Sequence, residues 1–177
     1  RAAFVLGKAH RKEREYQRAA QALQPVADRC RDPALRARAL YLWAAAAANA
    51  GQDGAALYRR LAREFPAEAT ADDALFFAAD LLARQGRAEE AARLLGDLVA
   101  RYPEGDYRAE ALFRLGWLAR RQGDAARAAA AFARAEGEYR DQDPYEHARA
   151  AYWRARVLFD RAGPEDAAAA RATATRT

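Results

Sequence analysis

Few residues of the types that carry chemistry occur in this chain. Cys30 is the single cysteine, and the two histidines, His10 and His147, are distant from it in the sequence. A nucleophilic thiolate needs a base beside it, and a metal site needs several ligands at short spacing. The sequence contains no serine, which excludes a serine triad. We therefore expect no catalytic residue, no cofactor-binding residue and no metal ligand in this chain.

Carboxylates occur in adjacent pairs at Asp72-Asp73 and Glu89-Glu90. Paired carboxylates can perform acid and base catalysis, but neighbours on a helix point in different directions around its axis. Both pairs lie near expected helix starts, where the helix dipole stabilises negative charge. We interpret them as residues that stabilise helix starts.

Tryptophan and arginine are the remaining candidates for ligand contact. Each of the three tryptophans is expected in the first helix of a helix pair, and arginines beside them could meet carboxylates of a partner. The six candidate residues of a concave binding face are Trp43, Arg114, Trp117, Arg121, Trp153 and Arg154. In the alternative interpretation, the tryptophans fill gaps that alanine leaves between repeats.

The composition predicts that helices must position these residues. Alanine, the best helix former, accounts for 52 of the 177 residues, whereas isoleucine is absent and valine is rare. Strands favour β-branched residues. We therefore predict an all-α protein whose helices approach one another closely.

The positive charge is dispersed along the chain. The formal net charge is +5, and of the 30 basic residues only Lys8 and Lys12 are lysine. The arginines alternate with aspartate and glutamate and form no compact basic run, which argues against a nucleic-acid partner. We interpret them as solvated residues on helix faces, with arginine in place of lysine as a GC-rich genome would encode it.

The sequence repeats itself with a shift of 37 residues. Residues 72–103 then fall on residues 109–140, so that Gln85-Gly86 matches Gln122-Gly123 and Leu95 matches Phe132. Similar patterns occur before and after this pair. We predict one repeat domain over residues 1–177, with repeats at about 1–31, 32–66, 67–103, 104–142 and 143–177.

Start and stop signals divide each repeat into two antiparallel helices. Asp-Pro pairs at 32–33 and 143–144 predict helix starts, and Thr70 with Asp73 resembles a capping box. Further aspartates at 53 and 124 follow glycines and could cap the next helix. The first helices are expected to end at Gly51, Gly86, Gly123 and Gly163.

Small residues mark the places where paired helices should cross. Gly7 and Gly116 lie in first helices, and we expect them to allow close approach of the second helix. Leu23, Leu95 and Phe132 would then fill the space one turn beyond the small residues of second helices, which are Ala19, Ala91 and Ala128.

At these residues the chain resembles the tetratricopeptide repeat. The repeat near Ala109 carries Leu112, Leu115-Gly116, Ala128, Phe132 and Ala135 in the order of that family's pattern, although Arg140 replaces the final proline. The resemblance implies a right-handed α-solenoid of about five antiparallel helix pairs. It also implies a protein or peptide partner in the concave groove.

A narrower resemblance rests on Tyr152-Trp153-Arg154-Ala155-Arg156 in a late, alanine-rich helix. This texture is similar to the helical N-terminal region of soluble lytic murein transglycosylases. The resemblance implies a non-catalytic scaffold in the periplasm that positions peptidoglycan or partner proteins. The family's catalytic Glu-Ser pair cannot occur here, so the catalytic domain would lie downstream of Thr177. Because the chain begins with Arg1, we expect it to be a piece of a longer protein.

The alternative function is a stand-alone tetratricopeptide interaction module, either an envelope-assembly protein or a cytoplasmic adaptor. RNA binding by helical repeats is a third interpretation, which requires a continuous basic stripe. No apolar segment is long enough to predict a membrane span.

Overall fold

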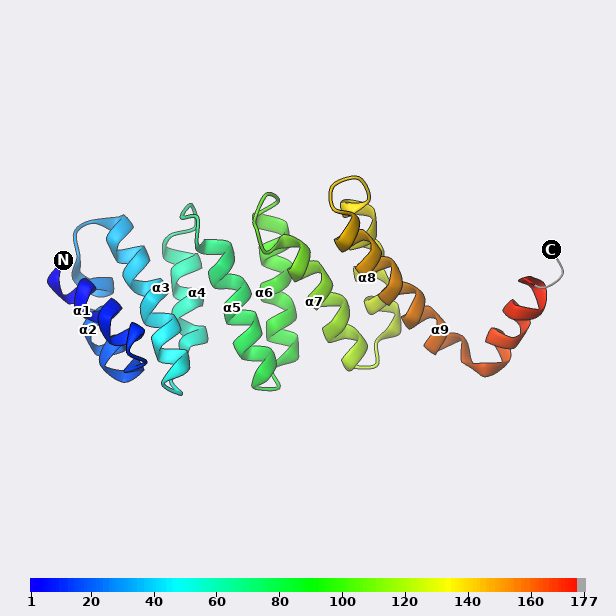
Figure 1. Ribbon diagram of the computed structural model, residues 1–177, viewed down its shortest axis with the longest axis horizontal. Coiled ribbons are helices and arrows are strands. Elements are labelled where there is room, and N and C mark those ends of the chain that lie inside the picture. Colours follow the sequence, from blue (N-terminus) through cyan, green and yellow to red (C-terminus); the bar gives the residue numbers. More distant parts are fainter. Residues whose placement is uncertain (175–177) are drawn as a thin grey trace. The chain divides into compact units, whose positions relative to one another are not determined.

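The computed structural model describes the backbone of residues 1–174 and the side chains of residues 1–161. Within these residues every regular element is a helix, which confirms the predicted all-α class (Figure 1). The helices are α1 (Ala2–Lys12), α2 (Tyr16–Arg29), α3 (Pro33–Asn49), α4 (Gly54–Glu64), α5 (Ala71–Arg84), α6 (Ala88–Arg101), α7 (Arg108–Arg121), α8 (Ala125–Tyr139) and α9 (Pro144–Ala174). No helix in the described part is both long and apolar enough to cross a membrane.

The chain divides into two compact units. The N-terminal unit, residues 1–107, contains α1 to α6, and the C-terminal unit, residues 108–177, contains α7 to α9. Inside each unit every helix packs mainly against the next one in sequence, and consecutive helices run in opposite directions (Figure 1). First helices of the pairs therefore end at one edge of the unit, and second helices end at the opposite edge.

The last predicted repeat differs from the other four. The sequence predicts a turn at Gly163, but α9 continues through this position from Pro144 to Ala174. The described chain thus has four antiparallel pairs followed by the single helix α9, which packs against α8. The side chains of residues 162–174 lie outside the described part of the chain.

Most predicted helix starts are confirmed by side-chain caps. The carboxylate of Asp53 accepts a hydrogen bond from the Ala56 backbone N–H at 3.0 Å, and the same arrangement occurs at Asp32, Asp124 and Asp143. The predicted capping box at Thr70 is wrong, because the Thr70 side chain makes no capping bond. Its expected partner, Asp73, instead accepts a hydrogen bond from the Tyr41 hydroxyl at 3.4 Å.

The turns between paired helices use the left-handed backbone region. Gly51, Gly86 and Gly123 have φ of 75°, 79° and 79°, as their predicted place after first helices requires. The α1–α2 turn departs from this rule, because Arg14 takes the position with φ of 62°.

Close helix approach is confirmed at both predicted glycines. A Cβ on Gly7 would lie 2.5 Å from Leu23 Cγ, and a Cβ on Gly116 would lie 2.6 Å from Phe132 Cε1. Leu23 and Phe132 are fully buried there. The helix pairs are therefore held by large side chains of second helices that occupy space left by glycines of first helices.

Candidate functional site

Two of the predicted binding residues meet in the C-terminal unit. The rings of Trp117 on α7 and Trp153 on α9 contact edge to face, with centroids 4.7 Å apart. The guanidinium carbon of Arg120 lies 5.3 Å from the Trp117 ring centroid and 5.2 Å from that of Trp153. Cation–π attraction at such distances contributes about 0.5–1 kcal/mol at an exposed position. The structure thus brings α7 and α9 together through two indoles and one arginine.

The indole pair of Trp117 and Trp153 packs against the core and also keeps its N–H groups accessible. Trp153 is half-buried against the apolar cluster that includes Phe132 and Val157, which supports the gap-filling interpretation. Neither Trp117 nor Trp153 donates its indole N–H to a described residue, and neither N–H is among the fully buried unpaired atoms. Both groups can therefore donate to water or to a partner.

The predicted arginines of this unit differ in how their charge is compensated. Arg114 Nε lies 3.0 Å from Glu110 Oε1, and Arg154 Nη1 lies 2.9 Å from Glu136 Oε2. Arg121 is exposed and forms no ion pair with a described residue. Two of the three cations are therefore already paired with carboxylates, and a ligand carboxylate would have to compete for them.

Trp43, the remaining predicted residue, belongs to the N-terminal unit. It is half-buried on α3 and packs against the cluster of Ala19, Ala20 and Ala46. The role of the six predicted residues in binding stays a prediction, and their packing contacts are what the structure adds.

A basic cavity that the sequence analysis missed lies in the N-terminal unit. Its volume is about 480 Å³, and its lining residues come from the ends of α1 and α3 and the start of α2. Figure 1 shows these helix ends at one edge of the unit. Its lining residues are Lys8, Arg11, Lys12, Tyr16, Ala45 and Asn49. No carboxylate is among them, so three cations face a single small space.

The three cations of this basic cavity are uncompensated. Lys8, Arg11 and Lys12 are exposed, and none forms an ion pair with a described residue. Asn49 is oriented by a 2.8 Å hydrogen bond from its Nδ2 to the Ala45 carbonyl. Ammonium and guanidinium donors with no acceptor of their own match the chemistry of a carboxylate ligand.

Helix stability explains only part of this charge. Arg11 and Lys12 lie in the last turn of α1, where cations favour the helix dipole. Lys8 lies outside that turn and four residues before Lys12, and such a pair of like charges costs an isolated helix about 0.2–0.5 kcal/mol. These are the chain's two lysines, and that exception in an arginine-rich sequence was the available signal.

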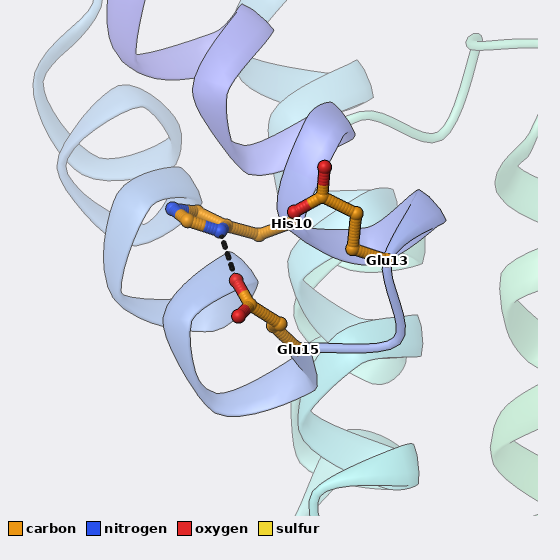
Figure 2. Close-up of side chains that lie close together, drawn as sticks. All are labelled: His10, Glu13 and Glu15. Carbon is orange, nitrogen blue, oxygen red and sulfur yellow. Dashed lines mark hydrogen bonds and ion pairs between the residues drawn. The ribbon is translucent and has the colours of Figure 1, made fainter.

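A His–Glu cluster closes the same α1–α2 turn (Figure 2). His10 Nδ1 lies 2.6 Å from Glu15 Oε2, and potential ligand atoms of His10, Glu13 and Glu15 lie within 4.8 Å of one another. The hydrogen bond with His10 is the main cause that lowers the pKa of Glu15, and Arg18 acts in the same direction. Glu15 thus already has two hydrogen-bonding partners, His10 and Arg18, so we assign the cluster to the packing of the turn.

The remaining nucleophile candidates stay apart. His147 Nδ1 contacts the Glu136 carbonyl at 2.9 Å, and His10 contacts Glu15, so within the described residues neither histidine is hydrogen-bonded to the half-buried Cys30. This geometry offers no activated thiolate.

Acidic groups and tyrosines lie deeper in the same N-terminal unit. The Tyr41 ring contacts that of Tyr58 at 5.6 Å between centroids, and both lie near the Phe77 ring. Burial is the main cause that raises the pKa of Tyr41 to about 12, and the Asp73 carboxylate adds to it. Burial also raises the pKa of Asp73, followed by the charge of Asp72.

Comparison with protein families matches the chain to the tetratricopeptide repeat over residues 73–105 and 110–141. These segments correspond to the two repeats that the 37-residue shift aligned. Among curated proteins, no match reaches significance.

Solved structures give the same fold over almost the whole chain. One similar structure is that of TPR-like repeats from a Podosopora anserina protein described as a putative kinesin light chain. Its sequence is 16% identical to this chain, the TM-score is 0.65, and the alignment covers 99% of this chain and 96% of that one. BtubC (BKLC) from P. vanneervenii is 19% identical to this chain at a TM-score of 0.66, and the alignment covers 98% of this chain and 77% of BtubC. MamA shares 14% identity at a TM-score of 0.58, covering 86% and 92%. At such identities the likeness establishes the fold alone.

Proposed function

We propose that this tetratricopeptide-repeat protein is a protein-interaction scaffold, and that its N-terminal unit binds an acidic segment of a partner in the basic cavity. The observation that carries the proposal is the presence of three unpaired cations around one cavity. Lys8, Arg11 and Lys12 supply these charges, while Arg114 and Arg154 elsewhere in the chain pair with glutamates.

The cavity suits a carboxylate side chain or a carboxylate chain terminus. A hydrogen bond to a charged group contributes about 1.5–3 kcal/mol net, and exposure to solvent reduces this value. Two such bonds, reduced by exposure, plus apolar contact with Tyr16 would give a binding free energy on the order of −4 kcal/mol, which corresponds to a dissociation constant in the millimolar range. Because the cations are exposed, salt should weaken the complex.

The indole pair of the C-terminal unit supports an interaction role independently. Tryptophan and arginine are enriched at binding hot spots, and the Trp117 and Trp153 N–H groups are open to a partner's acceptors. The neighbouring Tyr152 is 62% exposed and adds apolar surface beside Trp153.

A scaffold role inside a periplasmic lytic transglycosylase is the more specific proposal. It rests on the resemblance at residues 152–156, and the solved structures described above include no such enzyme. It requires a Glu-Ser catalytic domain encoded downstream of Thr177, which sequencing of the parent gene would reveal. The interaction-module proposal does not depend on that outcome.

The test is titration of a fluorescein-labelled peptide of alternating glutamate and alanine, followed by fluorescence anisotropy. The double variant Lys8→Gln/Lys12→Gln should bind at least tenfold more weakly than the wild type. The control is Arg63→Gln, which removes an exposed cation on α4 that forms no ion pair with a described residue. Equal affinity of the wild type and the double variant, or equal loss in the control, would show that the cavity is not the binding site.

A further inference from the structure

A second cavity of the N-terminal unit carries the opposite charge. Its volume is about 470 Å³, and its lining residues come from the segments after α4 and α6 and from the start of α5. Figure 1 shows these helix ends at the edge opposite to that of the basic cavity. Four carboxylates line it, from Glu68, Asp72, Glu104 and Asp106, against the one guanidinium of Arg101. Tyr102 and two prolines complete much of the remaining wall.

Asp72 is the unusual member of this acidic cavity. Its exposed fraction is 6%, and it is the one charged residue classed as buried among the described side chains. It forms no hydrogen bond or ion pair with any described residue. The Asp72 oxygens are not among the fully buried atoms, so they reach the cavity without a protein partner and can accept hydrogen bonds from a cationic ligand there.

The local cation does not satisfy Asp72. Arg101 directs Nη2 to the Ala62 carbonyl and to the Tyr102 hydroxyl, each at 3.3 Å, and its guanidinium carbon lies 5.4 Å from the Tyr102 ring centroid. The α5 helix dipole favours a carboxylate in its first turn but provides no hydrogen bond to Asp72. The negative charge of the cavity therefore remains available to a ligand.

The space beside the carboxylate is kept open by a glycine. A Cβ on Gly105 would lie 2.6 Å from Asp72 Oδ2 and 3.2 Å from Tyr102 Cβ. Among the described residues, three potential metal-ligand atoms lie within 4.8 Å of one another at His10, Glu13 and Glu15, and not in this cavity. The carboxylates of the acidic cavity therefore do not converge as metal ligands would. A larger cation with its own hydrogen-bond donors fits better than a bare ion.

We propose that this acidic cavity receives an arginine side chain of a partner protein. The planar guanidinium can donate two hydrogen bonds to the Asp72 carboxylate, and its aliphatic stem can lie along the Tyr102 ring and Pro103. This inference depends on the proposed function only in that the partner is a protein. It concerns a different cavity and ligand of opposite charge.

The experiment is NMR titration of the ¹⁵N-labelled full chain with the peptide acetyl-Gly-Arg-Gly-amide, at constant ionic strength. The amide signals of Tyr102, Gly105 and Asp106 should shift, and Asp72→Asn should weaken binding at least tenfold. Asp97→Asn, an exposed site on α6 outside the cavity, is the matched control and should leave the affinity unchanged.

Three further arms make the outcome decisive. Acetyl-Gly-Lys-Gly-amide should bind more weakly than the arginine peptide, because an ammonium lacks the two-pronged geometry, and acetyl-Gly-Glu-Gly-amide should shift none of these signals. Calcium chloride alone should also leave them in place. The proposal is overturned if the arginine peptide shifts nothing at residues 102–106, if Asp72→Asn binds as well as the wild type, or if calcium alone shifts the same signals. The Lys8→Gln/Lys12→Gln variant should bind the arginine peptide normally, so failure here is separable from failure at the basic cavity.

Discussion

The two cavities of the N-terminal unit are similar in volume and opposite in charge. Lys8, Arg11 and Lys12 line the one at the edge where α1 and α3 end, and carboxylates around Asp72 dominate the one at the opposite edge. Many other cations of the chain are paired with carboxylates, as Arg60 is with Asp28 and Glu64, whereas Arg63 and Arg121 are single exposed cations outside both cavities. Each cavity instead gathers several like charges around one space, which is the pattern expected of recognition surfaces.

Reversing the charge of the basic cavity should produce the largest effect. Lys8→Glu/Lys12→Glu places two anions where the acidic peptide must bind, and like charges brought together cost several kcal/mol. We expect affinity for the acidic peptide to fall about a hundredfold or more, while the arginine peptide still binds the other cavity. Anisotropy with both labelled peptides measures this, and parallel loss of both affinities would mean that the variant is unfolded or the cavities are not separate.

Filling the acidic cavity should have a moderate effect on stability. Gly105→Ala brings a Cβ against Asp72 Oδ2 and within 3.2 Å of Tyr102 Cβ, so both must move, and the free energy of unfolding should fall by about 1 kcal/mol. The matched control is Gly96→Ala in the interior of α6 of the same unit, where a Cβ meets nothing within 4 Å. That change should stabilise the helix by about 0.5–1 kcal/mol. Urea unfolding followed by circular dichroism should give shifts of opposite sign, and equal shifts would show that Gly105 holds no crowded position.

The smallest expected effect is on the pKa of Tyr41, on which the Asp73 carboxylate and the Arg11 guanidinium act in opposite directions. Burial and Asp73 raise the pKa of Tyr41 to about 12, and Arg11 opposes them. The folded state therefore holds this proton between the ordinary pKa near 10 and about 12, so the free energy of unfolding should fall as pH rises through that window.

Tyrosinate absorbance at 295 nm can follow this titration directly. Arg11→Gln should raise the Tyr41 pKa further, and Asp73→Asn should lower it, because each removes one of the charges that act on the phenol. Tyr41→Phe identifies its contribution to the absorbance change. If neither variant changed the pKa of Tyr41, the account that Arg11 and Asp73 act on this phenol in opposite directions would be wrong.

The fold was predictable because glycine and aspartate act locally. Gly51, Gly86 and Gly123 adopt the left-handed turns that their spacing predicts, and Gly116 receives Phe132 as the repeat alignment predicts. The failures involve contacts between elements. The Thr70 side chain makes no capping bond, and Asp73, which the spacing predicts as its partner, bonds instead to Tyr41 on another helix.

The binding surfaces were predictable only in part. The sequence predicts the place of Trp117 and Trp153 in first helices, and the structure joins them. It could not show that Glu110 and Glu136 would neutralise the arginines chosen beside them, since one of these ion pairs spans 18 residues of sequence and two helices. The acidic cavity was hidden for the same reason, because the α4–α5 and α6–α7 segments form it only when folded.

The most direct test of the account is paramagnetic relaxation of amide protons by small nitroxide probes of opposite charge. An anionic carboxylate nitroxide should broaden the amide signals of Lys12 and Asn49 more than a cationic ammonium nitroxide does. The order should reverse at Gly105 and Asp106, and Asp72→Asn should reduce that reversal. Equal broadening by both probes at the two sets of amides would contradict the claim that one unit presents two cavities of opposite charge.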